Sequence, residues 1–330
     1  MSVMELVTRD LYNIALVEPA SRGERLCIIS GYATATMASQ HLEHIVKKHK
    51  KRISLELVIG MTPIDGISLT DHTGFQSLSQ ETGLGYFQCS YVMRGCLPIH
   101  SKVYLWLQGN QPALAFTGSP NYTQTAFTGH QLEILTQCNA DAAWNYFRSL
   151  TDETIFCNHG EIEDYVTITK DRFLRSNQEN EESENTGHRL WEDLPHIGCP
   201  LLQTNGQIHS TGGLNWGNRG GRNPNQAYIP VPAEVQRSNF FPERGIHFTC
   251  LTDDGKTFIL VRAQENGKAL ETPTNNSLLG EYFRNRLGVP NGAFVTKDDL
   301  VRYGRTTVDF YKIDHDSYLM DFSSPADQRN

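Results

Sequence analysis

Five polar side chains between residues 100 and 133 are of the types that catalyse phosphoryl transfer: His100, Lys102, Ser119, Asn121 and Glu133. An imidazole can attack phosphorus, and a lysine with hydroxyl and amide donors can stabilise charge on the phosphate oxygens. A carboxylate can orient the imidazole and stabilise its protonated form. The set therefore indicates phosphoryl transfer without a metal ion, provided that the fold brings the five groups together.

That convergence depends on three neighbouring segments. The run HSKVYLWLQ (100–108) is expected to be a strand that opens with the histidine and the lysine on one face, because side chains alternate along a strand. The segment GSPNYT (118–123) is expected at a strand end and turn, and Glu133 falls in the next strand-like run, QLEILTQC (131–138). A second His-x-Lys, at 49–51, lies at the basic end of a predicted helix without a following Gly-Ser-x-Asn, and we interpret it as a solvated surface.

Strand and helix patterns alternate over the first 150 residues. Strands are expected over 26–32, 53–61, 85–93, 100–108, 113–119 and 131–138. Helices are expected over 34–51, 72–82 and 140–150. The alternation predicts an α/β sandwich with a mostly parallel or mixed sheet.

The pattern changes between Ile197 and Asp321, where short strands are separated by Gly, Asn and Pro turns. The expected strands are AYIPVP (227–232), IHFTCLT (246–252), KTFILVRAQ (256–264) and TTVDFYKI (306–313). One helix is expected, over 277–287. This half is typical of a β-barrel or sandwich with minor helical elements.

The net charge of −8 comes mostly from one short stretch. Residues 1–175 hold 14 basic and 17 acidic side chains, residues 176–193 hold one and six, and residues 194–330 hold 14 of each. The acidic stretch has almost no apolar residues, which is typical of a solvated linker. We therefore expect domains at 1–175 and 194–330, joined by an acidic linker at 176–193.

Composition excludes several classes of protein. The apolar runs are far shorter than the ~20 residues that a membrane span needs, and the first residues do not resemble a secretory signal. The seven cysteines are an odd number without a C-x-x-C pair, so we expect reduced thiols and no structural zinc. These features favour a cytoplasmic protein.

The segments HSK, GSPNYTQTAF and HQLEIL together resemble the catalytic motif of the phospholipase D superfamily, especially its nuclease branch. One departure is that the superfamily's aspartate, five positions after the lysine, falls here on Leu107. In the nuclease branch a later glutamate can take over that orienting role, so the resemblance assigns it to Glu133. It also implies two His-x-Lys motifs per active site and a phosphohistidine on His100. With one credible copy in this chain, we expect a homodimer through residues 1–175 with one shared site.

The resemblance extends through the second half. The segments LLQTNGQIHSTGGLNWGNRGGRNPNQAYIPVP and YGRTTVDFYKID are similar to the C-terminal half of NgoFVII-type restriction endonucleases. That family implies an α/β phospholipase-D-like nuclease domain followed by a mainly-β, B3-like pseudobarrel that binds DNA. It implies cleavage of double-stranded DNA at a short GC-rich site, with no divalent metal or other cofactor. The implied partners are DNA, a companion methyltransferase and an ATP-dependent helicase-like subunit.

Two polar segments of the second half are candidate DNA-reading arms, 214–227 and 262–277. Arginine pairs with guanine, and asparagine or glutamine with adenine. Arg302 and Arg305 are expected to hold either phosphates or acidic side chains of the fold. The candidate DNA-binding residues are Trp216, Asn218, Arg219, Arg222, Asn223, Asn225, Gln226, Lys268, Asn275, Asn276, Arg302 and Arg305.

Two other functions stay open. The first is a non-catalytic, phospholipase-D-like DNA-binding regulator, against which the complete set of five catalytic residues argues. The second is a lipid phosphodiesterase, which would need an interfacial amphipathic helix that the sequence does not offer and would leave the second domain unexplained.

Overall fold

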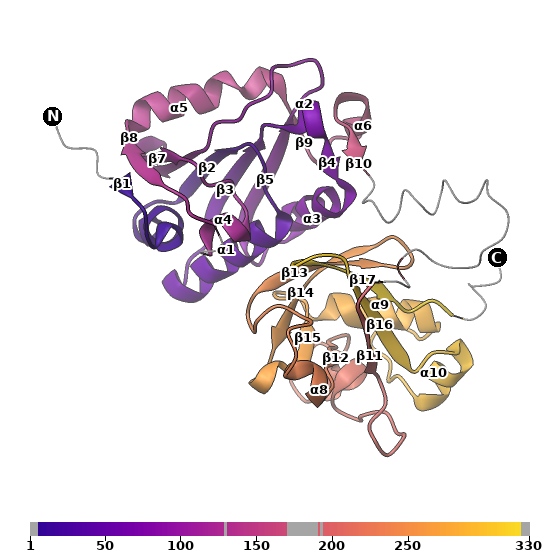
Figure 1. Cartoon of the computed structure of the whole chain (residues 1–330). Helices are drawn as coiled ribbons and strands as arrows, with labels where there is room; N and C mark the ends of the chain where they lie inside the picture. The colour runs from indigo at the N-terminus through magenta and orange to yellow at the C-terminus, as the bar shows by residue number, and fades with distance from the viewer. Residues whose placement is uncertain (1–5, 129–130, 170–190, 192–193, 325–330) are drawn as a thin grey trace. The chain divides into compact units, whose positions relative to one another are not determined.

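The computed structural model describes residues 6–128, 131–169, 191 and 194–324. The chain divides into two compact units, residues 1–172 and 173–330, which are described separately below (Figure 1). None of the described helices is long and apolar enough to cross a membrane. All seven cysteines are free thiols, as expected.

The first unit is built on an eight-stranded mixed sheet with the strand order β1-β8-β7-β6-β2-β3-β5-β9. Strands β2, β3 and β5 are parallel, whereas the other neighbouring pairs are antiparallel. The bounds are β1 Leu6–Val7, β2 Arg25–Ser30, β3 Ile53–Ile59, β5 Gly85–Val92, β6 Val103–Gln108, β7 Gln111–Gly118, β8 Leu135–Cys138 and β9 Thr154–Phe156. Two short strands, β4 (Ile67–Ser68) and β10 (Ile168–Thr169), pair separately.

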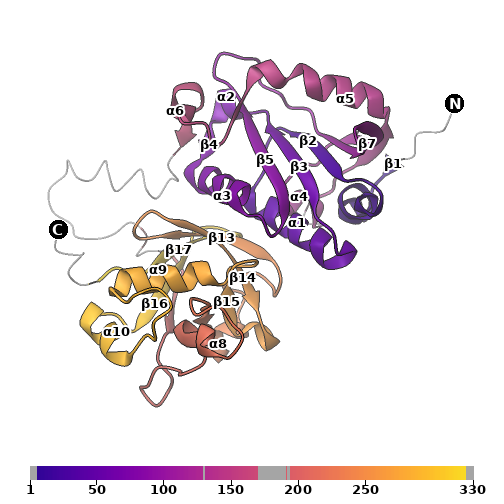
Figure 2. The same ribbon diagram turned by 180° about the vertical axis from the view of Figure 1, so that it is seen from behind.

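Helices cover both faces of this sheet. Helices α1 (Ala35–His49) and α3 (Leu69–Gln80) lie on one face, and α5 (Ala140–Ser149) lies on the other (Figures 1 and 2). Helix α1 begins at an N-cap, Thr34, and buries the apolar positions that its periodicity predicts, including Leu42 and Ile45. The short helices are α2 (Thr62–Asp65), α4 (Gln124–Phe127) and α6 (Ile162–Tyr165).

Two expected strands begin later than the sequence predicted, and both differences involve the site. Strand β6 begins at Val103 because the preceding segment crosses the end of β3, where Ile99 N donates to Gly60 O at 2.9 Å. A Cβ at Gly60 would lie 2.0 Å from Ile99 O, so this crossing requires a glycine. Strand β8 begins at Leu135 because Ile134 N donates to the Ser119 hydroxyl, at 3.0 Å. The expectation that His100, Lys102 and Glu133 lie within strands is therefore wrong.

The second unit is a seven-stranded sheet with the order β11-β16-β17-β13-β14-β15-β12. Its two edge strands approach each other, so the sheet is a nearly closed barrel around one apolar core. The strands are β11 His196–Pro200, β12 Ile229–Pro230, β13 His247–Thr252, β14 Thr257–Ala263, β15 Ala269–Glu271, β16 Thr307–Lys312 and β17 Ser317–Asp321. The helices are α8 (Ala233–Gln236), α9 (Ser277–Leu287) and α10 (Lys297–Tyr303), of which α9 has the predicted bounds.

The predicted acidic linker lies outside the described residues except for Trp191. That indole is 8% exposed and packs against Leu251 and Leu319 of the barrel. The folded part of the second unit thus includes a residue that the sequence analysis assigned to the linker.

Candidate active site and nucleic-acid interface

The ends of four strands meet at one edge of the first sheet. Pairing of Ile29 with Val103, and of Val103 with Thr117, aligns the end of β2, the start of β6 and the end of β7. Pairing of Gly118 with Leu135 adds the start of β8. The five predicted catalytic residues all lie just outside these strand ends: His100, Lys102, Ser119, Asn121 and Glu133.

His100 and Lys102 contact each other directly. Lys102 Nζ lies 3.1 Å from His100 Nε2 and donates to His100 O at 2.8 Å. The lysine is 6% exposed, and its burial lowers the pKa of the ammonium, against an opposing effect of the Glu133 carboxylate. His100 itself is exposed. A cation is thus fixed beside an imidazole that an incoming phosphate can reach.

Ser119 and Glu133 form the second pair. The Ser119 hydroxyl donates to Glu133 Oε2 while accepting from Ile134 N. Sequence analysis expected Glu133 beside the His100 ring. Among the described residues of one chain, the carboxylate instead hydrogen-bonds Ser119 and acts electrostatically on Lys102. Its orienting role toward His100 within the same chain is therefore not observed.

Asn121 is oriented by β2 and the residues after it. Its carboxamide oxygen accepts from Tyr32 N at 3.2 Å and lies 3.5 Å from the Ser30 hydroxyl, which leaves the amide nitrogen as a donor. A Cβ at Gly31 would lie 3.2 Å from the His100 ring and 3.3 Å from Asn121 Oδ1. Gly31 thus lets the imidazole and the amide approach, a role that a Gly directly after an apolar strand could have suggested.

Two residues that the sequence did not indicate hydrogen-bond residues of the motif segments. His41 of α1 donates from Nε2 to Leu16 O at 2.9 Å and accepts at Nδ1 from the Tyr122 hydroxyl, at 2.7 Å. Burial lowers the pKa of His41 to about 4, so this ring is neutral at pH 7. Tyr146 of α5 hydrogen-bonds the hydroxyl of Ser101, between the catalytic histidine and lysine, at 2.9 Å.

Exposed apolar side chains surround the site. Leu97 is 82% exposed, Leu132 is fully exposed beside Glu133, and Ile134 and Tyr32 are also exposed. Such side chains around a polar catalytic edge favour an interface with another protein surface.

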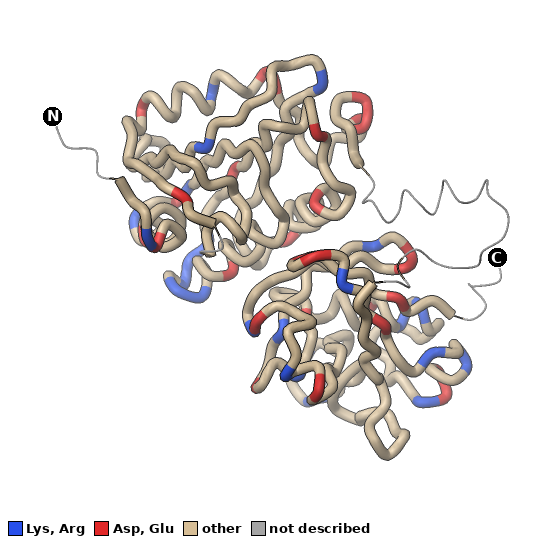
Figure 3. The backbone as a smooth tube through the Cα atoms, viewed as in Figure 1, with Lys and Arg blue, Asp and Glu red and all other residues tan. Residues whose placement is uncertain are grey.

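Two other positions bear on the motif, and one differs from the prediction: His49 is half-buried rather than part of a solvated surface. Leu107 is fully buried in the apolar core at the opposite end of β6, so no carboxylate replaces the missing aspartate there. His49 is the last residue of α1, where basic residues gather (Figure 3), and its Nε2 bonds Val17 O at 3.0 Å.

The segment 214–227 is not the flexible arm that the sequence suggested. It contains a 3₁₀ turn, Gly213–Asn218, and Trp216 is 8% exposed, with the Arg222 guanidinium 4.0 Å from its ring centroid. Asn225 donates to Glu281 and accepts from Gly292 N. These contacts make the segment an ordered loop.

The outer residues of this loop are available to a ligand. Asn218, Arg219, Arg222 and Asn223 are exposed. Among the described residues, the Arg219 side chain bonds the loop through Nε alone, which donates to Thr211 O at 2.7 Å. Arg222 donates to the Gln226 side-chain oxygen at 2.9 Å. Beside them lies a cavity of about 300 Å³, lined in part by Asn218, Arg219 and Phe294.

The second candidate arm, 262–277, is not an arm but part of the barrel and of the helix that follows it. It forms the end of β14, the strand β15 and the start of α9, and β15 pairs with both β14 and β12 in the barrel. Lys268 is exposed in it, whereas Asn275 and Asn276 hold the turn before α9. Arg302 pairs with Asp299 at 2.5 Å and Arg305 with Asp309 at 2.7 Å, so both arginines hold acids of the fold.

Within the described residues, one group of three side chains could ligate a metal ion: Asp314, His315 and Asp316. It lies in a turn of the second unit and includes none of the five catalytic candidates.

Comparison with known proteins gives a family assignment for each unit. Residues 9–164 match the model for the NgoFVII restriction endonuclease N-terminal PLD domain, and residues 189–314 match the NgoFVII C-terminal B3-like DNA-binding domain. Similar solved structures include NucT from Helicobacter pylori, at 12% identity and a TM-score of 0.35, covering 47% of this chain and 98% of that one. Another is the phospholipase D family member Nuc from Salmonella typhimurium, at 13% identity and a TM-score of 0.33, covering 47% and 97%. No curated protein sequence matches the chain.

Proposed function

Because the chain belongs to the NgoFVII restriction endonuclease family, with its PLD nuclease and B3-like DNA-binding domains, we propose that it is a type II-like, site-specific deoxyribonuclease. It hydrolyses phosphodiester bonds of double-stranded DNA at or near a short, GC-rich sequence. The observation that carries this proposal is the convergence of five catalytic side chains at one sheet edge, in a chain that also has a DNA-binding domain.

His100 is the proposed nucleophile. Its exposed ring can attack phosphorus, forming a P–N bond while the P–O bond to the leaving strand breaks. The departing oxygen takes a proton from a second imidazole, and water then attacks the phosphohistidine and restores the free histidine. Two displacements at phosphorus give net retention of configuration.

The other residues stabilise charge. The ammonium of Lys102, 3.1 Å from the attacking nitrogen, can transfer its hydrogen bond to a phosphate oxygen as the phosphate enters. The amide nitrogen of Asn121 adds a neutral donor. Glu133 holds the Ser119 hydroxyl in place and favours the charged form of Lys102. This arrangement supports cleavage without a divalent metal.

The second imidazole is proposed to come from a second copy of the chain. The exposed apolar side chains beside His100 and Glu133 support a dimer whose two half-sites meet at this edge. Family membership further leads us to propose a companion methyltransferase and an ATP-dependent helicase-like subunit as partners.

Incubation of the purified chain with plasmid DNA in EDTA, followed by mapping of the ends, tests the function. We expect cleavage that clusters at or near one sequence and is absent from the His100→Ala variant. If supplied Mg²⁺ is indispensable without ATP, the mechanism is wrong. If both proteins leave DNA uncut in every condition, including with ATP and the partner subunit, yet bind the same duplex, the chain is instead a regulator.

A further inference from the structure

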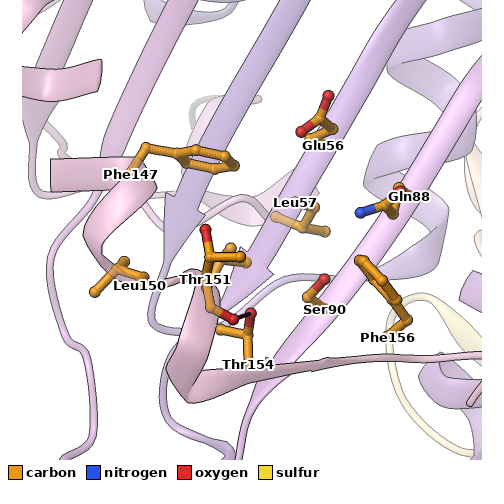
Figure 4. Close-up of a pocket in the computed structure, with 10 residues that line it drawn as sticks. Glu56, Leu57, Gln88, Ser90, Phe147, Leu150, Thr151, Thr154 and Phe156 are labelled. Atoms are coloured by element: carbon orange, nitrogen blue, oxygen red, sulfur yellow. Dashed lines mark hydrogen bonds between the residues drawn. The ribbon is translucent and has the colours of Figure 1, made fainter. Parts of the chain in front are cut away.

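The first unit contains a recess that the proposed chemistry does not use. It has a volume of about 220 Å³ and lies between the C-terminal end of α5 and the strands β3, β5 and β9 (Figure 4). This volume is sufficient for one heterocyclic ring system. The recess differs from the catalytic edge, since none of the five catalytic residues lines it.

Strand register builds a polar floor. Glu56 of β3 pairs with Gln88 of β5, and Ser90, two residues further along β5, pairs with Phe156 of β9. Residues two apart on a strand, and register partners on neighbouring strands, share a face of the sheet. A carboxylate, a carboxamide and a hydroxyl therefore lie next to one another on the floor (Figure 4).

The Glu56 carboxylate is held by Arg25 but still has free hydrogen-bond acceptor positions. Arg25 donates to Glu56 Oε1 from Nε at 2.5 Å and to Oε2 from Nη2 at 2.8 Å. A carboxylate offers about four acceptor positions, so about two remain for a ligand. The bidentate pair also fixes the direction in which they point.

Two hydrogen-bond donors of the floor are unused among the described residues. The Gln88 carboxamide oxygen accepts from the Tyr86 hydroxyl, which assigns its nitrogen to the opposite side of the amide. Ser90 is only 6% exposed and its hydroxyl has no partner among the described residues. A hydroxyl that opens into a cavity without a protein partner can bond a ligand or a water molecule there.

The walls are aromatic and the recess carries no cation. Phe147 of α5 and Phe156 lie on opposite sides of the floor (Figure 4), and Phe156 is 49% exposed. Of the described residues that line the recess, none is a lysine or an arginine, and the adjacent Arg25 is already paired with Glu56, so the recess is poorly suited to a phosphate. These features favour a planar, uncharged heterocycle.

We propose that this recess binds a nucleobase and prefers guanine. One edge of guanine presents two N–H donors beside the O6 acceptor. The N1–H donor matches one free position of the Glu56 carboxylate, and the adjacent O6 acceptor matches the neighbouring Gln88 nitrogen. Adenine would instead place a ring-nitrogen acceptor against the carboxylate, which is repulsive.

Titration of the full-length chain with GMP and AMP, followed by ligand-observed NMR, tests the proposal. We expect saturable binding of GMP, with AMP about tenfold weaker or more, since a mismatched donor and acceptor in a buried site costs at least that factor. Gln88→Leu and Phe156→Ala should each weaken GMP binding several-fold. Tyr165→Ala, which alters an exposed aromatic residue outside the recess, should not change it.

Two further measurements complete the design. Far-ultraviolet circular dichroism shows that each variant is folded. Competition with a DNA duplex shows where the base can come from. If the duplex displaces GMP, the recess can bind a nucleotide extruded from DNA. If it does not, the recess binds only a free nucleotide. Equal affinity for GMP and AMP, absence of saturation for both, or unchanged GMP binding in folded Gln88→Leu would each overturn the proposal.

Discussion

A single buried lysine determines what the imidazole beside it can do. Lys102 is almost inaccessible to solvent, and its ammonium bonds both the ring and the backbone oxygen of His100. An ammonium can only donate, so the ring nitrogen that faces it is the unprotonated one, and its lone pair becomes available for the proposed attack when Lys102 turns its hydrogen bond to a phosphate oxygen.

The nucleophile can be tested by stereochemistry. With a chiral phosphorothioate at the scissile bond, we expect net retention of configuration, because attack by His100 and then by water inverts phosphorus twice. His100→Ala should abolish cleavage and leave specific binding by the second unit intact. Net inversion would mean that water attacks in one step and that His100 acts as a base.

The neutral His41 makes stability depend on pH. Its pKa of about 4 in the folded protein lies below that of a free histidine, because the ring is fully buried. The unfolded chain therefore binds more protons between about pH 4 and 6.5, and the free energy of unfolding falls as pH is lowered through this range, by roughly 3 kcal/mol in total. Denaturant unfolding at several pH values should show this slope.

A His41→Gln variant separates this effect from other titrations. It removes the titrating ring and keeps hydrogen-bonding atoms. We expect lower stability at pH 7 and a flatter pH dependence than in the wild-type protein. A slope unchanged by the substitution would assign the effect to another group.

At the scale of elements, helix α5 packs against the segment 99–103, which carries His100 and Lys102, and fixes its position; we call this contact the clamp. Ile99 and Val103, which flank residues 100–102, pack in the same core as Ala143 and Phe147 of α5. The Tyr146 hydroxyl completes the clamp by bonding Ser101.

The contribution of this clamp is measurable with two small substitutions. Tyr146→Phe and Ser101→Ala each remove one partner of the bond, and each should lower kcat about two- to tenfold, with little change in KM. The double variant should lose no more than either single variant, because both remove the same bond. Asn145→Ala, at an exposed position of the same helix, is the control. Additive losses would show that the two residues act separately.

The loop at 214–227, a candidate DNA-reading segment, is the second element with a testable residue. Arg219 is exposed, and among the described residues its side chain bonds the loop through Nε alone, so its terminal nitrogens can pair with guanine. Arg219→Ala should weaken cognate binding by roughly 1–3 kcal/mol and relax discrimination at one base pair. An equal loss on all duplexes in a binding assay would reassign this arginine to phosphate.

Element patterns predicted much of the fold, and the failures have local causes. Helices α1, α5 and α9 lie where periodicity placed them, because their apolar faces are regular. Strand β15 was interpreted as part of an arm since it has three residues flanked by polar turns, too few to show alternation. The burial of Trp216 was missed because an aromatic residue among glycines and asparagines gives no sign of which side it faces.

At the scale of the whole molecule, tandem motifs predicted the family, and both domain models bear this out. The five catalytic candidates were also found from sequence, because strand ends in neighbouring positions must share a sheet edge. Their partners were not: Gly31, His41 and Tyr146 meet the motif only through long-range packing. Spacing in the sequence gives no sign of the contacts of His41 and Tyr146, whereas the position of Gly31 directly after an apolar strand could have suggested its role.

Assembly gives the last prediction. If each active site needs one His100 from each of two copies, a dimer of one active and one inactive chain must itself be inactive. Random mixing of equal amounts of wild type and His100→Ala, at constant total concentration, leaves about a quarter of the dimers wild type in both halves, so activity should fall to about a quarter. A chain that works alone would keep half of its activity.

Leu132→Asp should shift the protein toward monomer in light scattering and lower cleavage, because it puts a charge into the apolar rim beside Glu133. Val301→Asp, which alters an exposed apolar residue of the second unit, should do neither. Cleavage that falls only to half in the mixture, by a protein that scatters as a monomer, would place a complete active site within one chain.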